Sequence, residues 1–186
     1  MTEDKPSMAA KGTLEQVDAD RIRAAVTDFA ASELFQRTFD DGMAMVEETA
    51  AYLDGDGREQ SKDLPRRGAL AYAGESMRVT TRLMQVASWL LVQRAVRESE
   101  MTPEEASDQK YRLGAQEVCR ARSLDGVELV PAKLADLLER SSALYDRVER
   151  LDYKLYREGH SDNAGAGVQA QHDLIAAAFN SPKEED

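Results

Sequence analysis

The residue types that most often catalyse reactions or bind metals are few in this chain and are not grouped. Its two histidines, His160 and His172, lie near the C-terminus, and neither has a second ligand at a spacing that a folded element would hold. Cys119 is the single cysteine, and no histidine occurs in a predicted helix to activate it as a nucleophile. These residues predict neither a metal site nor a thiol enzyme.

Acidic clusters and glycine-containing turns give no catalytic pattern either. The DGDG turn at residues 54–57 resembles part of a calcium-binding loop, but aligning Gly57 with the invariant glycine of such loops puts Tyr52 at the first ligand position. Glu47-Glu48 and Glu104-Glu105 are sequence neighbours, so each pair points to different sides of a helix. No glycine-rich loop is followed by Lys-Ser or Lys-Thr to hold a phosphate. We therefore predict a protein that is not an enzyme and uses no metal or cofactor.

Composition and net charge further narrow the functional class and the cellular location. The chain has 186 residues, 42% of them hydrophobic, and a net charge of −11. An acidic surface disfavours direct nucleic-acid binding, because phosphate neutralisation needs an excess of lysine and arginine. The polar N-terminus has no apolar segment of the kind found in signal peptides. With a single cysteine and therefore no internal disulfide, these features predict a cytoplasmic location.

Helical spacing dominates the rest of the sequence, and no long period-two alternation suggests a sheet. We expect an unstructured segment at residues 1–17, then helices separated by a break at Ser32, where serine can cap a new helix. Thr102, Pro103 and Glu105 predict a third helix start with a capping box. Pro131 opens a last helix. Its heptad positions are apolar apart from one serine: Leu134, Leu137, Ser141, Leu144, Val148, Leu151 and Leu155. The prediction is an all-α, up-and-down bundle of three to four helices at residues 18–158.

The most apolar helix, predicted at residues 64–98, contains the segment MRVTTRLMQVASWLLVQRAV. Its longest run without charge, Leu83 to Val92, is ten residues. A helix that crosses a membrane needs roughly 20. We therefore expect no membrane insertion.

One side of this helix is predicted to bind a partner. At 100° per residue, the half formed by Val79, Leu83, Met84, Val86, Ala87, Leu90, Leu91 and Ala95 is apolar and predicts the core side. The other half carries both polar and apolar side chains. Two of its residue types, tryptophan and arginine, are enriched in protein interfaces. It contains Arg78, Arg82, Gln85, Trp89 and Gln93. The alternative is that Trp89 packs on a neighbouring helix of the same domain, with the arginine stems covering it.

Charge supports an interaction on this helix. Between Leu64 and Arg97 there are six arginines and one acid, Glu75, a net charge of +5 in a chain of −11. A basic helix in an acidic protein pairs either with acidic helices of its own chain or with an acidic partner. The sequence does not distinguish these two cases.

A second candidate contact lies in the C-terminal segment, residues 159–186, which has the composition of a flexible tail. Within it, Val168, His172, Ile175 and Phe179 follow helical spacing, too short to form a stable helix alone. Either these apolar residues are incidental, or Ile175 and Phe179 belong to a short recognition helix that folds on docking into a groove, of this protein or of a partner.

Four stretches together resemble a known family. These are TFDDGMAMVEETAAYLDGDGR, LAYAGESMRVTTRLMQVASWLLVQRAV, MTPEEASDQKYRLG and LADLLERSSALYDRVERL. They are similar to the alphaproteobacterial RcdA family, the regulator of CtrA degradation, over about residues 35–155. The resemblance contributes no catalytic motif.

The resemblance implies a helical, dimeric adaptor of regulated proteolysis that helps deliver cell-cycle regulators to the ATP-dependent ClpXP protease. Its implied partners are the protease machinery, a response-regulator-type adaptor, a cargo transcription regulator and a second copy of itself, and its implied location includes the cell pole. Two other functions stay open from the residues alone. One is a small-molecule-sensing bundle, for which Arg94 on the apolar half of its helix would be the indicator. The other is a plain dimeric scaffold.

Overall fold

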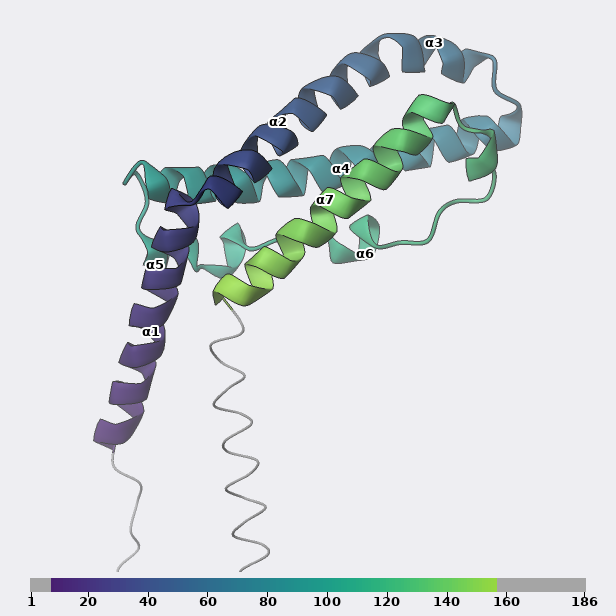
Figure 1. The fold of residues 1–186 in the computed structure, drawn as a ribbon. Coiled ribbons are helices and arrows are strands. Elements are labelled where there is room, and N and C mark those ends of the chain that lie inside the picture. The colour runs from purple at the N-terminus through teal and green to yellow at the C-terminus, as the bar shows by residue number, and fades with distance from the viewer. Residues whose placement is uncertain (1–7, 157–186) are drawn as a thin grey trace, which may run out of the picture.

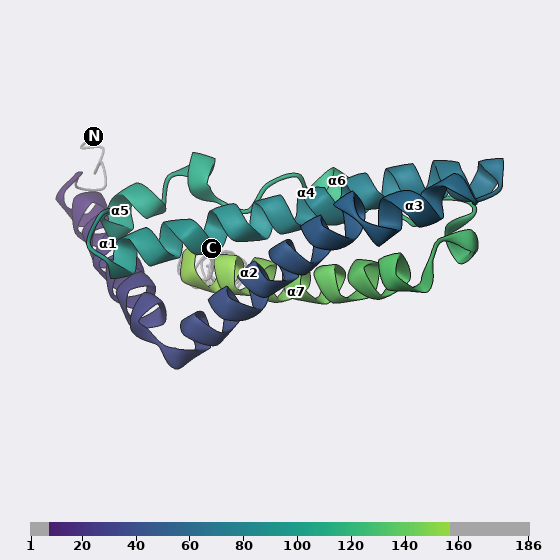
Figure 2. The ribbon, with the colours of Figure 1, turned by 90° about the horizontal axis from the view of Figure 1, so that it is seen from above.

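The structure is a computed structural model, which describes residues 8–156, with side chains from Gln16 onward. Its centre is the long helix α4, against which α2 and α7 pack to form a three-helix bundle (Figures 1 and 2). Helix α1 crosses the end of the bundle where α4 finishes, and contacts α4 and α5. The helices are α1 (Met8–Ala31), α2 (Glu33–Asp54), α3 (Asp56–Lys62), α4 (Arg66–Arg97), α5 (Pro103–Ala106), α6 (Gln116–Cys119) and α7 (Ala132–Tyr156). Two 3-10 turns, η1 (Gln109–Tyr111) and η2 (Val127–Leu129), lie in the connection before α7.

The predicted all-α class is confirmed, but the predicted number of helices is wrong. Within the described residues, three short helices, α3, α5 and α6, add to the four long ones. Helix α1 also begins at Met8, whereas the apolar spacing placed its start at Asp18. The earlier residues carry no apolar stripe, so hydrophobic periodicity gave no signal for helix there.

The capping residues explain two helix boundaries. Ser32 Oγ accepts a hydrogen bond of 3.1 Å from the Phe35 N–H, which confirms the break between α1 and α2. Thr102 and Glu105 form the predicted capping box, with reciprocal bonds of 3.2 and 2.8 Å. The caps were therefore readable in the sequence.

The predicted third helix is wrong beyond its first turn. Helix α5 ends at Ala106, and residues 107–131 cross the bundle as an irregular connection. Ala115 takes a left-handed conformation (φ 54°), and Val118 is 47% exposed. Leu113 and Cys119 are the side chains that this segment buries. Long polar side chains of α4 bond its backbone, so it needs no helix to satisfy those groups.

The core lies where α2, α4 and α7 meet, and it confirms the predicted heptad of α7. Leu134, Leu137, Ser141, Leu144 and Val148 are buried, while Leu151 and Leu155 are partly buried against the core. Helices α2 and α4 approach closely at Gly42, where an added Cβ would lie 2.8 Å from Leu90 Cδ1. Among the described helices, none is long and apolar enough to cross a membrane.

Candidate protein-interaction surface

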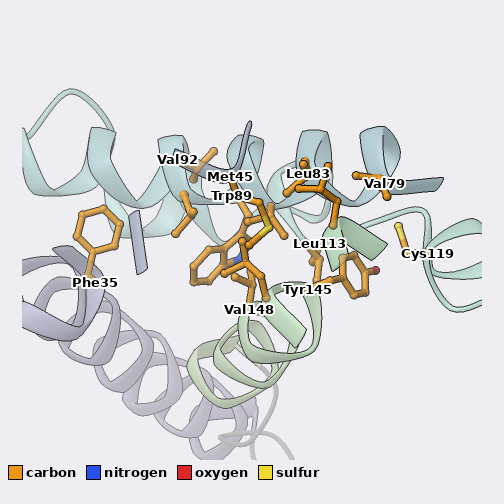
Figure 3. Packing of buried hydrophobic residues seen from close by; sticks show 14 of the residues in the cluster. Phe35, Met45, Val79, Leu83, Trp89, Val92, Leu113, Cys119, Tyr145 and Val148 are labelled. Carbon is orange, nitrogen blue, oxygen red and sulfur yellow. The ribbon is translucent and has the colours of Figure 1, made fainter. Parts of the chain in front are cut away.

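Trp89 is a core residue. Its side chain is 1% exposed and its ring centroid lies 5.8 Å from that of Phe29 (Figure 3). The indole Nε1 donates a hydrogen bond of 2.9 Å to Asp152 Oδ1 on α7. A buried indole N–H requires such an acceptor. Trp89 therefore joins α4 to α7 and is not available to another protein.

A buried polar network surrounds Trp89. Asp152 also accepts two bonds from Arg112, of 2.7 and 2.8 Å, and the Arg112 guanidinium lies 4.1 Å from the centre of the Tyr156 ring. Gln93 donates a bond of 2.9 Å to Tyr156 Oη, and burial raises the pKa of that phenol. The network connects α4, α7 and the segment after η1, so these side chains have structural roles.

The arginines of the same helix side anchor the irregular connection. Arg78 pairs with Glu75 at 2.6 Å and donates a bond of 2.8 Å to the carbonyl of Arg122. Arg82 donates to the carbonyls of Cys119 (2.8 Å) and Leu138 (3.1 Å), and burial lowers its guanidinium pKa.

Two α4 side chains bond amides of the same connection. Gln85 Oε1 accepts 3.0 Å from the Gly114 N–H, and Glu75 Oε1 accepts 2.7 Å from the Leu124 N–H. Polar residues of α4 thus serve as backbone partners for residues 114–124.

The predicted exposed partner face is therefore wrong. Four of its members, Arg78, Arg82, Trp89 and Gln93, are buried, and Gln85 is half-buried. The alternative, in which Trp89 packs within its own domain, describes the structure. The physical reason is that α7 and residues 112–124 supply acceptors for these donors. The other predicted contacts, Ile175 and Phe179, lie outside the described residues.

The apolar residues that face solvent lie on the opposite side of α4. They are Leu70, Met77, Met84 and Leu91, which are 67%, 70%, 64% and 51% exposed. We call this set the α4 stripe. The assignment of Met84 and Leu91 to the core side was wrong. A spacing of seven residues keeps all four on one line of the helix.

Between Arg67 and Arg94, α4 presents no exposed charge along the stripe, whereas at one end Leu70 lies beside Arg66, Arg67 and Asp125. The charged side chains between Arg67 and Arg94 on α4 are Glu75, Arg78 and Arg82, and all three are buried. Small or uncharged residues, among them Ala73, Thr80 and Ser88, fill the exposed positions between the large ones. In a chain with 32% charged residues, an uncharged apolar line along one helix is a candidate interaction surface.

A groove between α2 and α4 borders the stripe at Met84. Its volume is about 180 Å³, too small for most drug-sized ligands. Thr49, 3% exposed, lines it with a hydroxyl that has no hydrogen-bond partner. The other lining residues include Val46, Ala50 and Leu53 of α2 and Thr80, Met84 and Ala87 of α4. We call this hollow the α2–α4 groove.

Arg94, the residue that would indicate a small-molecule-sensing bundle, is not buried between helices. Arg94 is an exposed residue whose Nε pairs with Glu98 at 2.8 Å, and its guanidinium lies 5.3 Å from the centre of the Phe39 ring. The buried polar side chains of α4 that bond groups of the protein itself are Glu75, Arg78, Arg82 and Gln93. In the part of the chain that the structure describes, no group of His, Cys, Asp or Glu side chains is arranged to hold a metal ion.

Sequence reasoning missed the α4 stripe although a signal existed. The seven-residue spacing of Leu70, Met77, Met84 and Leu91 is visible in the chain. However, the same helix carries a second apolar line through Val79, Leu83, Val86 and Leu90, and periodicity does not say which line is covered.

Comparisons with known proteins extend these observations. A family model described as a protein of unknown function (DUF1465) matches residues 26–179. The crystal structure of RcdA from Caulobacter crescentus CB15 is similar to this chain, with 57% sequence identity and a TM-score of 0.58. The match covers 70% of this chain and 97% of that chain. No curated protein matches the chain.

Proposed function

This chain belongs to the RcdA family (DUF1465), as its sequence predicted, and from that membership we propose that it is a non-enzymatic adaptor of regulated proteolysis. In this proposal it helps deliver cell-cycle regulators to the ClpXP protease. Its partners are protease machinery, a response-regulator-type adaptor and a cargo transcription regulator. We place it in the cytoplasm, with enrichment at the cell pole.

The α4 stripe is the observation that supports an adaptor best. Burying these four large apolar side chains against a partner contributes less than about 1.5–3 kcal/mol each, the value for a fully exposed side chain, because they are 51–70% exposed. Methionine suits such a surface because its flexible side chain adapts to different partners. An adaptor with this surface acts by raising the local concentration of cargo at the protease, without chemistry of its own.

A homodimer is part of the proposal, as the family resemblance implies. It is tested separately, by light scattering of the full chain over a range of concentrations. A mass of one chain throughout would remove the dimer from the proposal. It would leave delivery of cargo to be tested on its own.

The test of delivery is degradation of a cargo regulator by ClpXP in the presence of the full chain. Met84→Glu places a charge in the middle of the stripe, and we expect it to lower the rate of degradation at least about tenfold, because burying an unpaired charge is costly. Leu91→Glu is a second substitution in the stripe, and Leu34→Glu is its matched control. Both leucines are 51% exposed, but Leu34 lies on α2 away from the stripe.

Two outcomes would count against the proposal. If the parent protein does not accelerate degradation at all, the adaptor function is wrong. If Met84→Glu and Leu91→Glu support delivery as well as Leu34→Glu does, the α4 stripe is not the contact.

A further inference from the structure

The α2–α4 groove lacks an occupant in the described part of the chain. Its walls come from Val46, Ala50 and Leu53 on one side and Met84 and Ala87 on the other, none of which carries a charge. The buried Thr49 hydroxyl needs a hydrogen-bond partner, and leaving such a group unsatisfied costs about 1–3 kcal/mol. An apolar segment with a polar group near its centre would satisfy both features.

We propose that residues 168–179 of this same chain bind in the α2–α4 groove as a short amphipathic helix. The segment VQAQHDLIAAAF places Val168, His172, Ile175 and Phe179 at steps of four, three and four residues. These side chains would pack against the groove. Gln169, Gln171 and His172 offer polar groups for Thr49.

The family comparison supports a role for this segment. The family model continues to residue 179, which is 23 residues beyond the end of α7 at Tyr156. The family model therefore includes residues 168–179. A short apolar helix is not stable alone in water, so it requires a surface to pack on.

The chain length allows the contact. Tyr156 lies beside Gln93, with a hydrogen bond of 2.9 Å, so the chain leaves α7 near the C-terminal end of α4. The eleven residues 157–167 span at most about 36 Å when extended. The groove begins about 10 Å along α4 from Gln93, and half the circumference of a helix adds roughly 15–20 Å. The groove residues Thr80 to Ala87 span about 10 Å along α4, and a helix of twelve residues, about 18 Å long, covers that length.

Charge favours one direction of the bound segment. A segment that enters from the C-terminal end of α4 runs toward its start, where Arg66 and Arg67 lie. Residues 184–186 are Glu-Glu-Asp, and they follow Phe179 at a distance that reaches those arginines. Opposite charges at this end favour the orientation, although such exposed pairs contribute less than about 1 kcal/mol each.

The proposal deepens the proposed function, because the groove shares Met84 with the α4 stripe. A segment bound in cis would compete with any partner that uses the stripe. The apparent affinity for the partner would then be the intrinsic affinity multiplied by the fraction of molecules in which the groove is open. The competition rests on the proposed function, but the docking itself does not.

Hydrogen exchange of the full chain tests the docking. We expect amides of residues 168–179 to exchange at least about tenfold more slowly than an unstructured peptide of that sequence. Ile175→Asp would remove this protection, while Ala177→Asp, on the opposite side of the predicted helix, would retain it. Protection absent from the parent chain, or equally retained in both variants, overturns the proposal.

A disulfide test identifies the occupant. In a chain with Leu53→Cys and Ile175→Cys, we expect a bond within one molecule under mild oxidation, at least about fivefold faster than for Leu34→Cys with Ile175→Cys. The native Cys119 is 2% exposed and does not compete. Bonds only between molecules would show that a second copy supplies the segment, and equal rates for both pairs would show no docking; either result overturns the proposal. Since neither measurement uses the protease, both can succeed even if the delivery assay fails.

Discussion

The indole of Trp89 donates its N–H to the carboxylate of Asp152 at 2.9 Å, although 63 positions separate the two residues in sequence. The same carboxylate accepts two bonds from Arg112. One acid thus holds together the C-terminal half of α4, the last turns of α7 and the irregular connection.

Replacing Asp152 by alanine is expected to destabilise the fold strongly. The substitution leaves the Arg112 guanidinium, whose side chain is 8% exposed, without its counter-ion. Breaking one side of a buried ion pair costs about 3–5 kcal/mol. Urea denaturation followed by circular dichroism gives the change in the free energy of unfolding. Asp136→Ala, at an exposed carboxylate on the same helix, is the control, and equal effects of the two variants would contradict the assigned role of Asp152.

Gly42→Ala is expected to destabilise the protein by about 1–3 kcal/mol, because overpacking forces a well-packed interior to shift. The new methyl group would lie 2.8 Å from Leu90 Cδ1, and Leu90 is fully buried. The melting temperature measures the effect. Ala44→Ser, two residues along α2 and exposed, should change stability by less than about 0.5 kcal/mol. An unchanged melting temperature for Gly42→Ala would show that α2 and α4 are less closely packed there.

Substitutions on the buried side of α4 should affect stability, and substitutions on its exposed side should affect partner binding. Trp89→Ala removes a fully buried aromatic ring and should lower the free energy of unfolding by about 3–5 kcal/mol. Leu91→Glu, at a residue that is 51% exposed, should leave stability within about 0.5 kcal/mol and weaken partner binding. Chemical denaturation and a binding assay on each variant separate the two effects. A Trp89→Ala protein that keeps parental stability would contradict the burial of this residue.

Acid should weaken the contact between α2 and α7 at Glu48. Hydrogen bonds from Arg140, of 2.7 and 2.9 Å, and from Lys133 lower the Glu48 pKa from 4.5 to about 2. Because the pKa is lower in the folded state, the stabilisation is complete above about pH 4.5 and is lost as the pH falls from 4.5 toward 2. The difference in stability between the parent and Glu48→Gln should therefore shrink over this range. Thermal melts at pH 7, 4 and 2.5 measure it, and a difference that stays constant would contradict the shifted pKa.

Local signals in the sequence were sufficient for the helical class and for several boundaries. The Ser32 cap, the Thr102 capping box and the heptad of α7 depend on residues within a few positions of one another, and all three appear in the structure. The four quoted stretches were also enough to identify the family, which the comparisons confirm. Short-range spacing and side-chain chemistry carry this information directly.

The orientation of α4 was decided only by the tertiary structure. Its sequence contains one apolar line through Val79, Leu83, Val86 and Leu90, and another through Met77, Met84 and Leu91. Arginines beside the first line suggested solvent, yet their acceptors are carbonyls 37 to 56 positions away, at Cys119 and Leu138. A buried donor is stable only where such an acceptor lies, and no local pattern locates it. The sequence by itself therefore determined the helical class and the family, whereas the packing of α7 and residues 112–124 determined which side of α4 faces solvent.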